Sequence, residues 1–195
     1  VYAFCNRSVF KCSMNQTVET VFPDIAIPSP TYSVAQAPDK DIYIGTESNG
    51  LYIYSENWKL KKHVPIDGII ATILPDNNGD IWLGLDETGI CLFNKNKQTF
   101  TWLHKDNTNL NNNSIRTFVS YGDSSILVGT FRGLNILNKK ELTITPANIN
   151  IAGKGGLSHY SIHSMLIDKD QTLWIGTYSA GVNYHSPFYR PVSYI

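Results

Sequence analysis

The sequence predicts an all-β protein of the β-propeller class, with about four to five four-stranded blades. Three observations lead to this prediction. One phrase of apolar, aromatic and glycine residues recurs along the chain, glycine and aromatic residues are frequent, and no stretch has helical periodicity. In the clearest copy, residues 76–93, an Asp/Asn/Gly turn precedes Ile81-Trp82-Leu83-Gly84, and a second apolar run follows Gly89.

Further copies lie at residues 39–54, 125–137 and 168–184, and a weak one without either glycine opens the chain. The aromatic position of successive copies, or its leucine substitute, recurs every 39 to 47 residues, at Tyr2, Tyr43, Trp82, Leu127 and Trp174. This spacing is typical of propeller blades. We expect structural roles for the aromatic or leucine position and the two glycines of each copy: Tyr43, Gly45, Gly50, Trp82, Gly84, Gly89, Leu127, Gly129, Gly133, Trp174, Gly176 and Gly181.

Each copy divides into four predicted strands. A first strand, expected to be buried on both faces, precedes the turn; a second ends at one glycine; a third follows the other glycine; and a fourth alternates as an outer edge should. The pair Asn78-Gly79 predicts a tight turn with positive φ at both residues. One propeller segment is expected over residues 1–195, with blades at 1–31 (partial), 32–68, 69–112, 113–159 and 160–195.

The charge and length of the chain exclude several classes. Lys plus Arg (16) equals Asp plus Glu (16) in 195 residues, so no net field attracts nucleic acid or an anionic membrane. No apolar run reaches the roughly 20 residues of a membrane helix, and no signal-peptide pattern opens the chain. Three cysteines leave at least one free thiol. Cys5 and Cys12 are either core thiols or a pair across a hairpin.

The residues do not predict a metal centre, a cofactor or catalysis. Asp76, Asn78, Asp80 and Glu87 match positions of a calcium loop, but its glycine position holds Ile81, so a structural turn is favoured. No pair of the five histidines has the spacing of metal ligands, and no Gly-x-Ser-x-Gly elbow of a hydrolase occurs. Trp82 and Trp174 are expected to fill the layer between blades, with sugar stacking as the lesser alternative.

Candidate ligand contacts lie where the copies differ, because a packing role would have kept them alike. The loops after the second strand of each copy offer carboxylates, a guanidinium and aromatic rings, which suit an oligosaccharide. The residues that we select are Glu47, Glu87, Phe131, Arg132 and Tyr178. A solvated loop is the alternative for each.

Two stretches carry a family resemblance. Leu110-Asn111-Asn112-Asn113-Ser114-Ile115 before an Asp-rich turn, and Leu157-Ser158-His159-Tyr160-Ser161-Ile162 before Leu173-Trp174-Ile175-Gly176-Thr177, resemble the two-component regulator propeller repeat. The resemblance implies the periplasmic sensor region of a hybrid two-component histidine kinase of Bacteroides-type bacteria. In that family two seven-bladed propellers precede a β-sandwich, a membrane helix and a kinase, so the chain looks like a fragment, an incomplete arc of a seven-bladed propeller.

The implied function is sensing of a glycan or oligosaccharide on the periplasmic side of the inner membrane. The implied signal is a phosphorelay through absent cytoplasmic domains, with a homodimer formed through the parent sensor and no direct contact with nucleic acid. Membrane attachment would come through a missing helix, and no catalysis and no cofactor are expected in this segment. A protein-interaction scaffold and a propeller lyase or glycosidase are the alternatives. The open faces of an arc would be covered by further chain or by a dimer, unless five blades close a ring.

Overall fold

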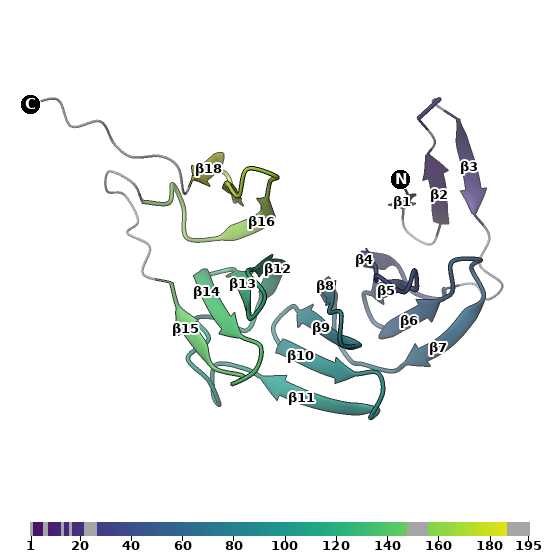
Figure 1. Cartoon of the computed structure of the whole chain (residues 1–195), viewed down its shortest axis with the longest axis horizontal. Helices are drawn as coiled ribbons and strands as arrows, with labels where there is room; N and C mark the ends of the chain where they lie inside the picture. Colours follow the sequence, from purple (N-terminus) through teal and green to yellow (C-terminus); the bar gives the residue numbers. More distant parts are fainter. Residues whose placement is uncertain are drawn as a thin grey trace, which may run out of the picture. The chain divides into compact units, whose positions relative to one another are not determined.

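The computed structural model describes residues 2–5, 8–12, 14–15, 17–21, 27–147 and 156–186. These residues form strands and turns and contain no helix, hence none long and apolar enough to cross a membrane. The strands make five antiparallel sheets in chain order (Figure 1), which we call blades 1 to 5. The all-β fold class predicted from the repeat is confirmed.

The strands of each blade follow one another along the chain and in the sheet. Blade 1 has β1 (Tyr2–Cys5), β2 (Ser8–Cys12) and β3 (Val18–Val21); blade 2 has β4 (Thr31–Gln36), β5 (Ile42–Thr46), β6 (Leu51–Tyr54) and β7 (Leu60–Val64). Blade 3 has β8 (Ile70–Pro75), β9 (Asp80–Leu85), β10 (Gly89–Asn94) and β11 (Thr99–Leu103); blade 4 has β12 (Ile115–Tyr121), β13 (Ser125–Thr130), β14 (Gly133–Asn138) and β15 (Ile144–Pro146). Blade 5 has β16 (Ile162–Ile167), β17 (Leu173–Thr177) and β18 (Val182–His185).

The predicted four-strand division matches these elements. Blades 2 to 4 each have four strands, and blade 1 begins with the counterpart of a second strand. The fourth strand expected in blade 5, at residues 189–194, lies outside the described residues.

The chain divides into two compact units, Val1–Leu103 with Asn113–Ile115, and His104–Asn112 with Arg116–Ile195. The first contains blades 1 to 3, and the second contains blade 5 and nearly all of blade 4. Each unit has its own apolar core. The single propeller segment and its blade limits stay predictions.

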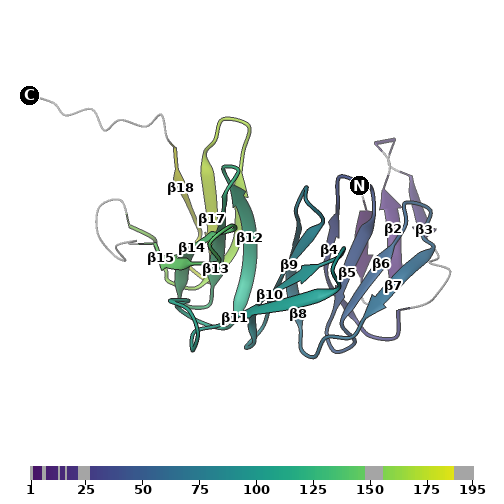
Figure 2. The ribbon, with the colours of Figure 1, turned by 60° about the horizontal axis from the view of Figure 1, so that its bottom comes forward.

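In the first unit, blades 2 and 3 pack face to face (Figure 2). Tyr43, Leu51 and Ile53 of blade 2 share a core with residues of blade 3 that include Ile70 and Leu83. The two sheets can approach this closely because residue 45 is glycine. A Cβ atom at Gly45 would lie 2.6 Å from Cγ2 of Ile70. A side chain at this position would therefore push the two sheets apart.

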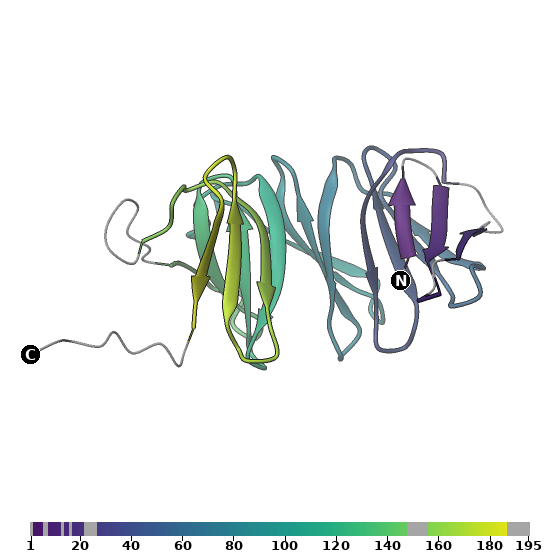
Figure 3. The same ribbon diagram turned by 90° about the horizontal axis from the view of Figure 1, so that it is seen from above.

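In the second unit, blades 4 and 5 pack in the same way (Figure 3). Leu127 and Leu134 of blade 4 share a core with Ile162 and Ile175 of blade 5. A Cβ atom at Gly129 would lie 2.6 Å from Cγ2 of Ile162. In both units, the isoleucine that opens the following blade therefore packs against the next-to-last residue of the second strand, which is a glycine.

The prediction that the first strand of each blade is buried on both faces was wrong. Residues of β4 and β16 are mostly half-buried or exposed, whereas β5 and β6 are buried throughout. The sheet order explains the difference, because the first strand lies at an edge and the second and third strands lie between neighbours. A continuous apolar run therefore marks the two central strands.

The turn at Asn78-Gly79 differs from the predicted one, because only Gly79 has a positive φ (88°). The Gly79 N–H donates to the Asp76 carbonyl (3.2 Å), and the Asp76 N–H donates to the Asp80 carbonyl (2.8 Å). The same pair of bonds recurs in blades 2 and 5, where Lys40 and Gln171 take the position with positive φ. The repeat therefore uses a four-residue turn with one left-handed residue, a common hairpin connection.

The hairpin register excludes one of the two cysteine interpretations. Cys5 pairs with Ser8, and Cys12 lies four residues further along β2. Four residues of a strand span about 13 Å, whereas the Cα atoms of a disulfide lie about 4 to 7 Å apart. Cys5 and Cys12 therefore do not pair across this hairpin.

Candidate functional site

The loop after the second strand of each blade holds the ligand contacts selected from the sequence. In the first unit, Glu47 follows β5 and Glu87 follows β9, and both are exposed. The Glu47 N–H donates to the Pro30 carbonyl (3.0 Å), and the neighbouring Asp86 N–H donates to the Ile69 carbonyl (3.0 Å). Each loop is thereby tied to the residue that precedes the first strand of its own blade.

In the second unit, Phe131 and Arg132 follow β13 and Tyr178 follows β17, and all three are exposed. The Tyr178 N–H donates to the Ser161 carbonyl (3.0 Å), which repeats the tie seen in the first unit. The Arg132 N–H donates to Oγ1 of Thr130 (3.0 Å). These hydrogen bonds fix the backbone of the loops while the side chains stay exposed, as in recognition loops on a rigid scaffold.

The five selected residues thus fall into two sets, Glu47 with Glu87 in one unit and Phe131 with Arg132 and Tyr178 in the other. Each set occupies equivalent loops of the blades in its unit. That one ligand touches both sets stays a prediction.

Three of these loops are each supported by a threonine at an equivalent position, which we did not select from the sequence. The hydroxyls of Thr46, Thr130 and Thr177 donate to the carbonyls of Gly50, Gly133 and Gly181 at 2.8, 2.9 and 3.0 Å. Each threonine is the last residue of the second strand of its blade and directly follows the glycine of that strand. The recurring Gly-Thr pair was visible in the sequence and is the signal that could have identified this role.

The structure shows a second candidate site, at the opposite end of the strands in the first unit. A cavity of about 230 Å³ is lined by the turns that join β4 to β5, β8 to β9, and β10 to β11. Its polar lining residues are Asp39, Asp76, Asn77, Asn78, Asp80, Lys95 and Asn96. Because antiparallel strands alternate in direction, these turns lie at the end away from Glu47 and Glu87.

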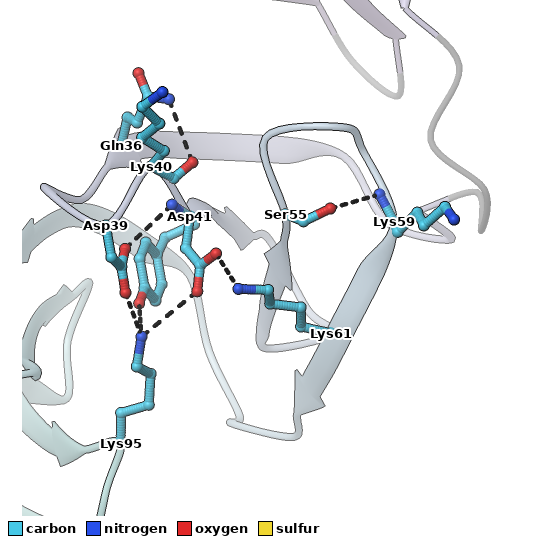
Figure 4. A network of polar contacts seen from close by, with 9 residues as sticks. Gln36, Asp39, Lys40, Asp41, Ser55, Lys59, Lys61 and Lys95 are labelled. Carbon is cyan, nitrogen blue, oxygen red and sulfur yellow. Dashed lines mark hydrogen bonds and ion pairs between the residues drawn. The ribbon is translucent and has the colours of Figure 1, made fainter.

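Lys95 connects two blades at this cavity (Figure 4). Its Nζ donates to Oδ2 of Asp39 (2.7 Å) and to the Tyr43 hydroxyl (3.2 Å), and it lies 3.5 Å from Oδ2 of Asp41. Asp41 also accepts a hydrogen bond from Lys61. Blade 3 therefore supplies an ammonium group to carboxylates and a phenol of blade 2.

The pKa shifts follow from this network. The hydrogen bond from Lys95 lowers the pKa of Asp39 below its ordinary value. Burial acts to lower the pKa of Lys95, but the hydrogen bonds to Asp39 and Tyr43 outweigh it and raise this pKa. Burial raises the pKa of Tyr43. Lys95 and Asp39 are therefore charged, and Tyr43 is neutral, at neutral pH.

Asp80, which lines this cavity, is hydrogen-bonded to two amide side chains. Asp80 accepts bonds from Asn78 (2.8 Å) and Asn94 (2.6 Å) through its two carboxylate oxygens. Among the described residues, no group of three His, Cys, Asp or Glu side chains could hold a metal ion. The arrangement joins two blades and presents polar groups that can exchange hydrogen bonds with hydroxyl groups.

The aromatic repeat positions have different environments. Tyr43 and Trp82 are each 1% exposed, whereas Trp174 is 40% exposed. Trp174 lies against the Tyr184 ring, with centroids 5.6 Å apart, and its Nε1–H donates to Asp168 (2.7 Å). Within the described residues, Trp174 thus lies on an open face of blade 5, and its expected place between two blades stays a prediction.

Comparisons with known proteins agree with this architecture. The family model described as Two component regulator propeller matches residues 156–179. The comparison with curated proteins found no match.

Several solved structures resemble the chain. The extracellular domain of BT3049 of B. thetaiotaomicron, described as a hybrid two-component system, is 27% identical with a TM-score of 0.69, over 92% of this chain and 24% of that one. The extracellular domain of BT4673 of the same organism, described likewise, is 19% identical with a TM-score of 0.74, over 94% and 25%. PorZ of Porphyromonas gingivalis, a surface component of the type-IX secretion system, is 17% identical with a TM-score of 0.68, over 96% and 31%.

The chain spans about a quarter of the two extracellular domains that it resembles. Its sheets, their strand order and the glycine contacts between blades are those of a propeller array. The chain is thus a β-propeller segment that carries a two-component regulator propeller repeat and resembles the extracellular domains of Bacteroides hybrid two-component systems.

Proposed function

We propose that the chain is an extracytoplasmic ligand-sensing segment of a hybrid two-component sensor and that its ligand is a glycan or oligosaccharide. The family match and the likeness to the extracellular domain of BT3049 support the sensing role. The observation that carries the ligand class is the set of exposed Phe131, Arg132 and Tyr178 on backbone-tied loops of the second unit. Aromatic faces and a guanidinium suit the apolar faces and hydroxyls of sugars.

The proposed mechanism is a shift between two arrangements of paired sensors. A ligand that binds one arrangement more tightly increases its population, and the difference in affinity sets the size of the shift. The signal then passes by phosphorelay through domains outside this chain, on the far side of the inner membrane. This segment itself binds and does not catalyse.

The test is a thermal-shift screen of the chain against oligosaccharides of plant and host origin. A ligand present at 100 times its dissociation constant stabilises the folded state by about 2.7 kcal/mol. Stabilisation by a defined class of sugar, without product formation, supports the proposal. Turnover of the sugar would show that the segment is an enzyme. A screen in which no sugar stabilises the chain would point to an interaction scaffold.

A matched pair of variants locates the site. Tyr178→Ala should raise the sugar concentration that is needed for the same stabilisation at least tenfold. This corresponds to a loss of about 1.4 kcal/mol of binding free energy. Tyr121→Ala, at a comparably exposed tyrosine of the same unit, should leave it unchanged (exposed fractions 63% and 52%). Equal effects of the two substitutions would remove the loops from the proposal.

A further inference from the structure

The segment directly before β16 carries two stacked aromatic rings. The centroids of the His159 and Tyr160 rings are 4.4 Å apart, and the ring planes are inclined by 24°. Tyr160 is nevertheless 44% exposed. Its ring is thus held by a neighbouring ring and remains accessible to solvent.

A backbone hydrogen bond fixes the His159 ring. The Ser161 N–H donates to Nδ1 of His159 (3.0 Å). Because Nδ1 accepts this bond, it carries no hydrogen, and the ring hydrogen is on Nε2. Among the described residues Nε2 makes no hydrogen bond, so it can donate to a hydroxyl group of a ligand. The pair therefore offers a ring for stacking and a hydrogen-bond donor beside it.

Tyr160 lies next to Tyr178, one of the contacts selected from the sequence. The Tyr178 N–H donates to the carbonyl of Ser161, the residue after Tyr160 (3.0 Å). Tyr178 is 63% exposed. The segment before β16 and the loop after β17 thus each place an exposed tyrosine at the same edge of blade 5.

Phe131 of blade 4 lies at the same end of the second unit. Gly129 and Ile162 mark the contact between the two blades, since a Cβ atom at Gly129 would lie 2.6 Å from Cγ2 of Ile162. Phe131 follows Gly129 by two residues, in the direction in which β13 runs toward its loop. Tyr160 precedes Ile162 by two residues, and β16 runs away from the loops, so both aromatic residues lie beyond this contact at the loop end.

Three exposed aromatic residues of two adjacent blades therefore gather at one end of the second unit. They are Phe131, Tyr160 and Tyr178, with exposed fractions of 43, 44 and 63%. Of these, the differences between copies identified only the two that follow a second strand.

The packing of a blade does not require an aromatic residue at the position of Tyr160. The backbone bond that ties each loop to its blade ends at Pro30 in blade 2 and at Ile69 in blade 3. The residues before these two, Ser29 and Gly68, therefore correspond to Tyr160. Ser29 is buried against its own loop, with its Oγ 3.2 Å from Oγ of Ser48. A small residue thus suffices at this position.

The copy that opens blade 4 agrees with this comparison. There Asn112 and Asn113 stand where blade 5 has His159 and Tyr160. The two aromatic rings are therefore specific to blade 5 among blades 2 to 5, as expected for residues that serve recognition and not packing.

We propose that Tyr160 contacts the glycan, a role that rests on the sensing function proposed above, and that His159 positions it. Sugar rings stack their apolar faces on Phe131, Tyr160 and Tyr178, and Nε2–H of His159 donates to a sugar hydroxyl. Because one sugar ring stacks on one aromatic ring, three rings suit a chain of sugars better than a monosaccharide. The ligand class is an oligosaccharide of pyranose units with accessible apolar faces.

The first experiment compares sugar chains with single sugars in a thermal-shift assay. The probes are cellohexaose, xylohexaose and galactohexaose, with glucose, xylose and galactose beside them, and any other pyranose oligosaccharide that stabilises the chain in the screen above. A stabilising oligosaccharide should act at a concentration at least about tenfold lower than its monosaccharide. Equal potency of the two would overturn the proposal.

The second experiment tests Tyr160 by titration calorimetry with the oligosaccharide that stabilises best. Tyr160→Ala should raise its dissociation constant at least about tenfold, and Tyr160→Phe, which keeps the ring, should change it by less than about threefold. Tyr121→Ala, at a comparably exposed tyrosine of the same unit, is the control and should leave it unchanged. Without sugar, Tyr160→Ala should shift the melting temperature by less than about 2 °C.

Two variants separate the ring of His159 from its donor. His159→Phe keeps a stacking ring and should raise the dissociation constant about threefold, whereas His159→Ala should raise it about tenfold. His163→Ala, at an exposed histidine of β16, is the control. Binding by both His159 variants as tight as by the wild type would overturn the positioning role.

These measurements distinguish the present proposal from the sensing function on which it rests. If an oligosaccharide binds the wild type and Tyr160→Ala equally well, Tyr160 is not a contact, and the sensing function stands. If no oligosaccharide binds the wild type, both proposals fail.

Discussion

At the scale of single residues, Lys95 joins two sheets through one ammonium group. It donates to Asp39 and to Tyr43, and its side chain is 27% exposed against 52% for Asp39. Water screens a pair this exposed, so its contribution to stability is modest. Its effect should appear as a dependence on pH.

Lys95→Met should lower the free energy of unfolding by about 1 kcal/mol at pH 7. Since the pKa of Asp39 is lower in the folded state, its contribution is present above the unfolded pKa near 3.8 and is lost as pH falls through the folded pKa. The difference between the two proteins should therefore shrink below that pH. Urea denaturation at pH 7 and pH 3 measures it, with Lys97→Met as the control; a difference independent of pH would contradict the assignment.

Gln171 occupies the left-handed position of the first turn in blade 5, with φ of 60°. An L-residue with a side chain is disfavoured there, and glycine is not. Gln171→Gly should therefore raise the free energy of unfolding by about 0.5 to 1 kcal/mol. Chemical denaturation checks this, and Asp170→Gly, one residue earlier in the same turn, should destabilise instead. Stabilisation by both or by neither would show that the turn does not have this geometry.

At the scale of elements, the spacing between packed blades depends on a glycine near the end of the second strand, Gly45 in blade 2 and Gly129 in blade 4. A Cβ at Gly45 or Gly129 would meet the isoleucine of the next blade at 2.6 Å. Among the residues that the structure describes, a Cβ at Gly176 would meet only Ser164, whose hydroxyl can rotate away. Equivalent positions therefore differ in what surrounds them.

Gly45→Ala and Gly129→Ala should each lower the free energy of unfolding by about 1 to 3 kcal/mol, the cost of overpacking. Gly176→Ala should change it by less than about 0.5 kcal/mol. Equilibrium denaturation of the three variants decides the matter. If all three lost the same stability, the glycines would act through the backbone and not through contact between blades.

At the scale of the whole molecule, each unit has an apolar core of its own. In an array, each repeat is stabilised by its neighbours, so a core substitution acts first on the adjacent sheets. Leu83→Ala, in the core of blades 2 and 3, should cost about 2 to 5 kcal/mol, and so should Ile162→Ala in the core of blades 4 and 5.

Amide hydrogen exchange locates these effects. Leu83→Ala should speed exchange most in β5, β6, β9 and β10, and Ile162→Ala most in β13 and β17. Equal acceleration in all five sheets would show that the chain unfolds as one cooperative unit.

The period of the repeat predicted the all-β fold well, because the recurring aromatic or leucine position and the glycine after it lie in the second strand of blades 2 to 5. Strand positions followed from apolar runs and turn residues, and blades 2 to 4 each have the four strands expected of a copy. Two local features were missed. Burial of the first strand depends on its place at the sheet edge, and the left-handed positions of Lys40 and Gln171 have no glycine to mark them.

The candidate sites were predictable in part. The exposed loop residues, such as Arg132 and Tyr178, were found because they differ between copies. The cavity around Lys95 was not, because Lys95 and Asp39 are 56 residues apart and meet only when two blades stack. The supporting Thr46 could have been found from the recurring Gly-Thr pair.

By itself the sequence determined the blade as a unit: its period, its strands and the glycine at which one sheet meets the next, because all of these recur as local patterns. The tertiary structure decided which side chains meet between blades and which of the described side chains are exposed. Lys95 reaches Asp39, and Trp174 is exposed where Tyr43 is buried, because such contacts depend on the neighbouring sheet and not on the residue's own repeat.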